Sequence, residues 1–123
     1  MSRSHPEYLK HILDEINYIE CAIRSLQKDV FLADETLKRS FVRSIEIIGE
    51  AAKKLESHLK DKYPDVEWKR IAGMRNHLIH DYFGIDYHIV WDVAKNKLPR
   101  LKQRITDILR HEAALGAGPQ DTP

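Results

Sequence analysis

The sequence predicts an all-α protein, an up-and-down bundle of about five helices, and two observations lead to this prediction. Apolar residues recur every three or four positions through most of the chain, as in amphipathic helices that bury one face. No stretch shows the alternation of apolar and polar residues that is typical of a half-buried strand. The 123 residues, 42% of them hydrophobic, suit one compact domain.

Two long helices open the predicted bundle. The first is expected over about residues 7–27, because Pro6 suits a first helical turn and apolar residues follow it at helical spacing. The second is expected to begin after Asp34, whose carboxylate can accept hydrogen bonds from the free amides of the first turn. Its apolar stripe continues to Leu59, and residues 60–64 are expected to end it.

Three shorter helices are predicted in the second half of the chain. The third is expected over about residues 66–81, with Asp65 as its cap and Gly84 as the residue that stops it. A fourth helix is expected after Asp86, and a fifth begins near Pro99. Trp68 and Trp91, on these helices, are expected to pack in the core or at an interface.

One domain is expected over residues 1–115, and residues 116–123, which are small and polar, are expected to form a disordered tail. No run approaches the roughly 20 apolar residues of a membrane-spanning helix, and the N-terminus lacks the apolar core of a signal peptide. Cys21 is the single cysteine, so no disulfide can form within the chain. We expect its side chain to be buried in the first helix. These features favour a cytoplasmic protein.

Two glycines interrupt otherwise good helical patterns. Gly49 and Gly73 each cost roughly 1 kcal/mol relative to alanine in a helix interior. Close packing between two helices is the simplest explanation for both. At Gly73 the alternative is the close approach of a partner chain or of a nucleotide.

The net charge does not by itself indicate nucleic-acid binding, because 20 Lys and Arg against 19 Asp and Glu give only +1. A local basic cluster lies near the end of the chain, with little acid among its members. A solvated basic face is the default interpretation, and binding of a phosphate backbone is the alternative. The cluster consists of Lys95, Lys97, Arg100, Lys102, Arg104 and Arg110.

The segment of residues 75–82 gathers a cation, an amide, two imidazoles, a carboxylate and a phenol, which is more polar chemistry than a structural helix needs. Arg75 can hold a phosphate through two parallel hydrogen bonds. His80 can move protons near neutral pH. Asn76 lies roughly 40° from His80 on a helical wheel, so it can orient that ring or bind phosphate. The segment therefore indicates a site that handles phosphate or nucleic acid.

The wheel of the third helix places these groups on opposite sides. Arg75 falls roughly 40° from Ile71, among the residues expected to face the core, whereas His80 falls roughly 140° from Arg75 and about 7.5 Å along the axis. A buried guanidinium needs a partner or a path to water. One interpretation is a cleft completed by a second copy of the chain, with the helix buried on both sides. The other is that Arg75 pairs with a carboxylate while His80 is simply exposed.

Two further sets of side chains have alternative interpretations. His77 and His80 could share a metal ion, but no third ligand has a convincing position, so we expect no metal and no cofactor. Glu46 and Glu50 could form an acid pair, although a solvated face near Arg43 is more usual for such residues.

The stretch from Trp68 to Tyr82 resembles the HepT group of HEPN-domain proteins. Arg75 through His80 matches the family's Arg-x4-6-His signature, and Tyr82 completes its longer Arg-x4-His-x-Tyr form. The second helix around Gly49, and Trp91 with the later Leu-Pro pair, are similar as well. The likeness spans most of the chain, and the extended motif is fairly specific.

The resemblance implies a HEPN-type helical bundle that dimerises and brings the motif into a cleft between protomers. It implies a ribonuclease toxin of a toxin–antitoxin pair, with Arg75 and His80 as catalytic residues and Asn76 and Tyr82 in support. The antitoxin of such pairs resembles a minimal nucleotidyltransferase, MntA, which transfers AMP from ATP to the motif tyrosine, here Tyr82. The alternatives are an inactive HEPN module that binds nucleotide or a nucleotidyltransferase, and a purely structural helical dimer.

Overall fold

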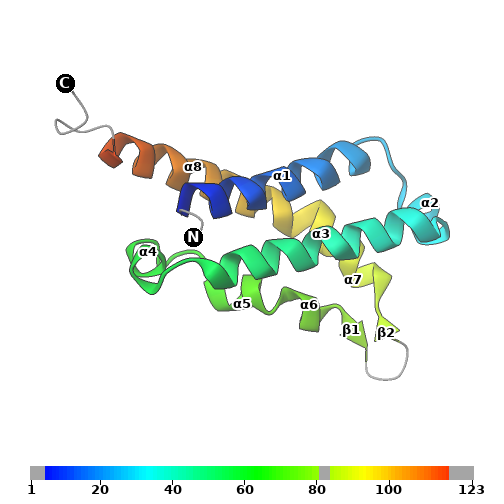
Figure 1. Cartoon of the computed structure of the whole chain (residues 1–123). Helices are drawn as coiled ribbons and strands as arrows, with labels where there is room; N and C mark the ends of the chain where they lie inside the picture. The colour runs from blue at the N-terminus through cyan, green and yellow to red at the C-terminus, as the bar shows by residue number, and fades with distance from the viewer. Residues whose placement is uncertain (1–4, 81–83, 117–123) are drawn as a thin grey trace.

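The structure is a computed structural model that describes residues 5–80 and 84–116. Three long helical segments run side by side in alternating directions, which confirms the predicted all-α bundle (Figure 1). They are α1 (His5–Ile23), α3 (Glu35–Lys54) and a continuous run made of α7, η1 and α8. Of the three, α1 packs against both α3 and the η1–α8 part of the run, and α3 also packs against the short helices α5 and α6.

The first two helices differ from expectation mainly at their ends. The first, α1, ends at Ile23, and an additional short helix, α2 (Lys28–Ala33), follows it. The next helix, α3, begins as predicted, because the carboxylate of Asp34 accepts a hydrogen bond from the backbone N–H of Leu37 at 2.9 Å. Phe31 of α2 is fully buried, which ties the unexpected helix to the core.

The apolar stripe of α3 continues past the end of the helix. The helix ends at Lys54, where Leu55 takes an extended backbone conformation, and a separate helix, α4 (Ser57–Lys62), follows. Leu55 and Leu59 are nevertheless both buried. The stripe therefore predicted the buried residues correctly but not the break in the helix.

The predicted third helix is wrong as a single element. It is replaced by α5 (Trp68–Ala72) and α6 (Met74–His77), which meet at Gly73, and then by two short antiparallel strands. The strands are β1 (Ile79–His80) and β2 (Gly84–Ile85), which the sequence pattern did not predict. Asp65, the expected cap, instead pairs with Arg104.

The lack of a side chain at Gly49 allows α5 to pack closely against α3. A Cβ atom built on Gly49 would stand 3.2 Å from the carbonyl oxygens of Ile71 and Ala72, so the absence of a side chain lets the end of α5 approach α3. This confirms close helix packing at Gly49. Gly73 has no such neighbour: its built Cβ meets only the Lys69 carbonyl oxygen, at an ordinary 3.4 Å.

The predicted fourth and fifth helices form one continuous helical run. Asp86 caps α7 (Tyr87–Asp92) by accepting hydrogen bonds from the backbone N–H groups of His88 and Ile89. A π-helical turn, η1 (Val93–Lys97), leads directly into α8 (Leu98–Gly116). Pro99 has no N–H to donate, and the wide turn just before it lets the helix continue where we expected a break.

The core is formed by isoleucine, leucine and phenylalanine side chains of α1, α3 and α8, with Trp68 also buried. Cys21 is exposed, contrary to expectation. It lies two residues from both Ile19 and Ile23, which are buried, so it falls on the other side of α1. Residues 117–123 of the expected tail lie outside the described residues. No helix among the described residues is long and apolar enough to cross a bilayer.

Candidate functional site

The motif residues follow the junction of α5 and α6 along one edge of the bundle (Figure 1). Arg75 and Asn76 lie in α6, and His80 lies in β1, where its backbone pairs with Gly84. The structure places the backbone of His80 but not its side chain, and Tyr82 lies outside the described residues. The helical-wheel relation between Asn76 and His80 does not hold, because α6 ends at His77.

Arg75 is on the surface and not in the core. Its side chain is 55% exposed, whereas Met74 and Leu78 on the same segment are buried. Its Nε donates a hydrogen bond to Oε2 of Glu46 at 2.5 Å. Glu46 belongs to α3 and its side chain is 23% exposed, so the ion pair joins the motif to α3. Pairing of Arg75 with a carboxylate was one part of the second interpretation; its other part, the exposure of His80, concerns a side chain outside the description.

The ion pair leaves part of the guanidinium available. Among the described residues, only Nε of Arg75 has a hydrogen-bond partner, and neither terminal nitrogen has one. A guanidinium held by Nε can present its two terminal nitrogens to phosphate oxygens. Asn76, the next residue, is exposed and adds an amide at the same surface.

Glu46 is the functional candidate that sequence reasoning did not assign. The sequence pattern indicated it only as half of an acid pair with Glu50 or as part of a solvated face. The structure separates the two carboxylates: Glu50 pairs with Arg43 at 3.7 Å, where both side chains are 61% exposed. The need of Arg75 for a counterion was the available signal, but it does not reveal which carboxylate supplies it.

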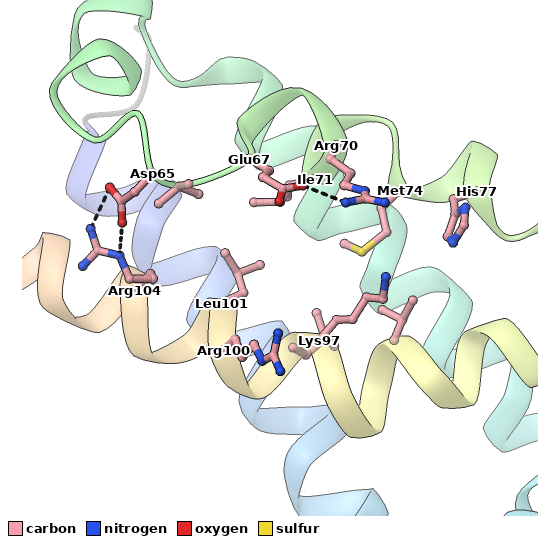
Figure 2. A pocket seen from close by; sticks show the side chains of 13 residues that line it. Asp65, Glu67, Arg70, Ile71, Met74, His77, Lys97, Arg100, Leu101 and Arg104 are labelled. Atoms are coloured by element: carbon pink, nitrogen blue, oxygen red, sulfur yellow. Dashed lines mark hydrogen bonds and ion pairs between the residues drawn. The ribbon is translucent and has the colours of Figure 1, made fainter.

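A pocket of about 350 Å³ lies on the other side of α6, between α5–α6 and the η1–α8 segment (Figure 2). Its apolar lining includes Ile71, Met74 and Leu101, and His77 lies at one end. The members that carry charge are Asp65, Glu67, Arg70, Lys97, Arg100 and Arg104.

Two ion pairs stand at the rim of this pocket. Arg104 binds Asp65 with two hydrogen bonds, of 2.7 Å and 3.1 Å, and Arg70 binds Glu67 at 2.9 Å (Figure 2). The guanidinium of Arg104 lowers the pKa of the Asp65 carboxyl, chiefly through their hydrogen bond. The Asp65 carboxylate is therefore ionised at neutral pH, and both carboxylates are already paired with an arginine.

The idea of a shared metal at His77 and His80 loses its geometric basis. It required helical spacing between the two imidazoles, and α6 ends at His77. In the ranges that the structure describes, no three His, Cys, Asp or Glu side chains gather as metal ligands would.

Comparison with known proteins gives a consistent result. The model of the family described as "Ribonuclease HepT-like" matches residues 12–108. A protein of Caldanaerobacter subterraneus subsp. tengcongensis named "Putative RNase TTE0752" is 43% identical over 105 residues, covering 85% of this chain and 94% of its own. A "Probable ribonuclease HepT" of Thermococcus cleftensis is 39% identical over 102 residues, covering 83% and 93%. No solved structure matches with significance.

Proposed function

Because the chain belongs to the HepT-like ribonuclease family, we propose that it is a metal-independent endoribonuclease in which Arg75 and His80 act on the phosphodiester bond. We place it in the cytoplasm, as the toxin of a toxin–antitoxin pair. The observation that supports this most directly is the ion pair of Arg75. Its guanidinium is anchored by Glu46, its side chain is 55% exposed, and neither terminal nitrogen has a hydrogen-bond partner among the described residues.

The proposed reaction needs three contributions from the protein. A 2′-hydroxyl must lose its proton as it attacks the neighbouring phosphorus, and the leaving 5′-oxygen must gain one as its bond to phosphorus breaks. The charge that develops on the phosphate oxygens must be stabilised. His80 can serve as the proton carrier, and Arg75, with Asn76 beside it, can hold the phosphate.

A homodimer fits this chemistry. One motif contains one strong proton carrier at His80, whereas two motifs facing one cleft supply both an acid and a base. We therefore propose that two protomers bring the segments around α6 together. Static light scattering at micromolar concentration measures the mass directly, and a strictly monomeric protein would exclude the composite site.

We further propose that Tyr82 is the point of control. An MntA-like nucleotidyltransferase antitoxin would transfer AMP from ATP to its hydroxyl. Each AMP group adds about one negative charge and a bulky adenosine. Tyr82 is two residues from His80 in the motif. The phosphate of the attached AMP can therefore bind the guanidinium of Arg75 in place of an RNA phosphate.

The catalytic assignment predicts that Arg75→Ala and His80→Ala each abolish RNA cleavage and growth inhibition while leaving the helix content unchanged. Cleavage of a labelled RNA and circular dichroism measure the two properties. RNA cleavage by His80→Ala at the wild-type rate would refute the assignment, and full loss of wild-type activity in EDTA would refute metal independence. RNA binding without cleavage by the wild-type protein would favour an inactive HEPN module.

The control assignment predicts that Tyr82→Phe prevents neutralisation, because the acceptor oxygen is gone while most of the ring remains. Intact mass after incubation with the antitoxin and ATP should increase for the wild type and stay constant for Tyr82→Phe. An equal mass increase in both proteins would place the modified residue elsewhere.

A further inference from the structure

The pocket between α5–α6 and η1–α8 contains positive charge that its own carboxylates do not balance. Four cations and two carboxylates line it, which gives a formal charge of +2, whereas the whole chain carries only +1. Two of the cations, Arg70 and Arg104, are held by the rim ion pairs. The side chains of Lys97 and Arg100 are exposed and form no ion pair or hydrogen bond with any residue in the described ranges.

Several other members of the basic cluster noted in the sequence interact within the fold. Lys102 binds Glu20 of α1 at 2.7 Å, and the ammonium group of Lys95 lies 6.0 Å from the ring centre of Trp91. Neither residue lines the pocket. Arg110 is exposed and has no ion pair in the described ranges, but it does not line the pocket, so Lys97 and Arg100 are the unpaired cations of the cluster at this site.

The two available cations are placed to act together. Lys97 ends the π-helical turn η1, and Arg100 follows three residues later, so both lie on one face of the helical run. The side chain of Lys97 extends across the pocket toward Met74 and His77 on α6 (Figure 2). The same pocket is lined by the apolar side chains of Met74 and Leu101. Cations beside apolar side chains complement a phosphate attached to a flat base.

We propose that this pocket binds one nucleotide unit of a single-stranded RNA, with its phosphate on Lys97 and Arg100 and its base against Met74 and Leu101. The inference rests on the proposed function, to which it adds a contact outside the Arg-x4-His motif. A pocket of about 350 Å³ is at the small end of ligand sites, which suits one unit of a longer chain. Helix α6 supplies both Met74 to the pocket and Arg75 to the motif, so one short element connects the two sites.

The experiment measures binding separately from cleavage. The probe is a fluorescent single-stranded RNA with 2′-O-methyl groups, which removes the attacking hydroxyl, and a second arm uses AMP. The double variant Lys97→Ala/Arg100→Ala should bind the RNA at least about tenfold more weakly. The dependence of log Kd on log salt should become shallower by roughly 0.7 for each phosphate that the variant no longer neutralises.

A matched control removes the same charges elsewhere. Lys10→Ala/Arg110→Ala deletes one lysine and one arginine that are exposed and line no part of the pocket, and it should bind RNA like the wild type. The charge-conserving variant Lys97→Arg/Arg100→Lys should retain most of the affinity. Equal reductions of affinity in the test and control variants would overturn the proposal, because they would indicate a diffuse charge effect.

Three other results also decide the matter. Unchanged RNA affinity in Lys97→Ala/Arg100→Ala would overturn the proposal, and combined with loss of AMP binding it would assign the pocket to a free mononucleotide. A changed solution mass with unchanged RNA affinity would make the pocket a contact between protomers. Specific RNA binding through the pocket by a wild-type protein that never cleaves unmodified RNA would refute the proposed function and leave the pocket assignment intact.

Discussion

The ion pair between Arg75 and Glu46 is the contact on which the proposed site depends at the scale of single residues. Nε is occupied by Glu46, which restrains the guanidinium, and neither terminal nitrogen has a hydrogen-bond partner among the described residues. Removing the negative charge would free the side chain of Arg75 to adopt other rotamers. Glu46 therefore acts as a positioning residue for Arg75 in the proposed reaction.

We predict that Glu46→Gln lowers kcat/KM for RNA cleavage about tenfold, or about 1.4 kcal/mol of transition-state stabilisation. Glu50→Gln is the matched control on the same helix, since Glu50 pairs with Arg43 and not with the motif, and it should leave cleavage unchanged. Initial rates over a range of RNA concentrations measure both. Faster cleavage by Glu46→Gln would show instead that the carboxylate restrains Arg75.

The sequence identified the motif residues but misplaced Arg75 and His80. Arg75 was recognised from its neighbours and its spacing to His80, yet its predicted burial was wrong, and His80 lies in β1 and not in a helix. The wheel assumed one uninterrupted helix, whereas the helix breaks at Gly73 and ends at His77. The partner of Arg75 lies 29 residues earlier, in another helix, and only tertiary packing brings Glu46 to it.

At the scale of helices, the two internal glycines have different roles that the sequence could not separate. Alanine is favoured over glycine by roughly 1 kcal/mol in a helix interior, where Gly49 lies, whereas Gly73 lies at the junction of two helices. At Gly49 this gain is opposed by the backbone carbonyls of Ile71 and Ala72, which a new Cβ would meet at 3.2 Å. At Gly73 the neighbouring oxygen is at an ordinary contact distance, and the backbone φ of −96° suits any residue.

We predict that Gly49→Ala lowers the free energy of unfolding by about 1–2 kcal/mol, because backbone atoms of α5 must move to accept the methyl group. Gly73→Ala should change it by less than about 1 kcal/mol, toward greater stability. Urea unfolding followed by circular dichroism compares the two variants with the wild type. Equal effects of the two substitutions would contradict the contact at Gly49.

Helical periodicity predicted which side chains are buried better than where helices begin and end. Leu55 and Leu59 are buried on either side of a break, and Asp34 and Asp86 cap helices as their sequence positions indicated. Pro99 was expected to mark a new helix, but the π turn before it keeps the helical run continuous. Helix breaks and π-helical turns of this kind depend on how the segments pack against one another. They do not change the spacing of apolar residues, so the sequence pattern does not reveal them.

At the scale of the whole molecule, one polar cluster fastens the end of α4 to the C-terminal part of α8. The carboxylate of Glu112 accepts hydrogen bonds from Tyr63 at 2.6 Å and from Lys62 at 2.7 Å. The contacts join residues about fifty positions apart, at the end of the bundle away from the strands (Figure 1). Hydrogen bonds from Lys62 and Tyr63 lower the pKa of Glu112, whereas burial, and next the bond to Glu112, raise the pKa of Tyr63 to about 12.

These pKa shifts predict two pH ranges in which the free energy of unfolding changes with pH. A lowered Glu112 pKa means that the unfolded chain binds more protons near pH 4.5, so this contribution is present above that pH and is lost as the pH falls through the lowered pKa. The raised Tyr63 pKa means that the unfolded chain loses its phenolic proton first. Its contribution is therefore present below pH 10.0 and is lost as the pH rises toward about 12.

Tyr63→Phe should therefore cost about 1 kcal/mol of unfolding free energy at neutral pH, and its deficit relative to the wild type should shrink between pH 10.0 and about 12. Glu112→Gln should cost a similar amount at neutral pH, with a deficit that shrinks below pH 4.5. Urea unfolding at a series of pH values gives both differences. A deficit for Tyr63→Phe that stays constant through the alkaline range would show that the phenol of the folded protein ionises like that of the unfolded chain. The cluster would then not hold α4 to α8 through the Tyr63 hydroxyl.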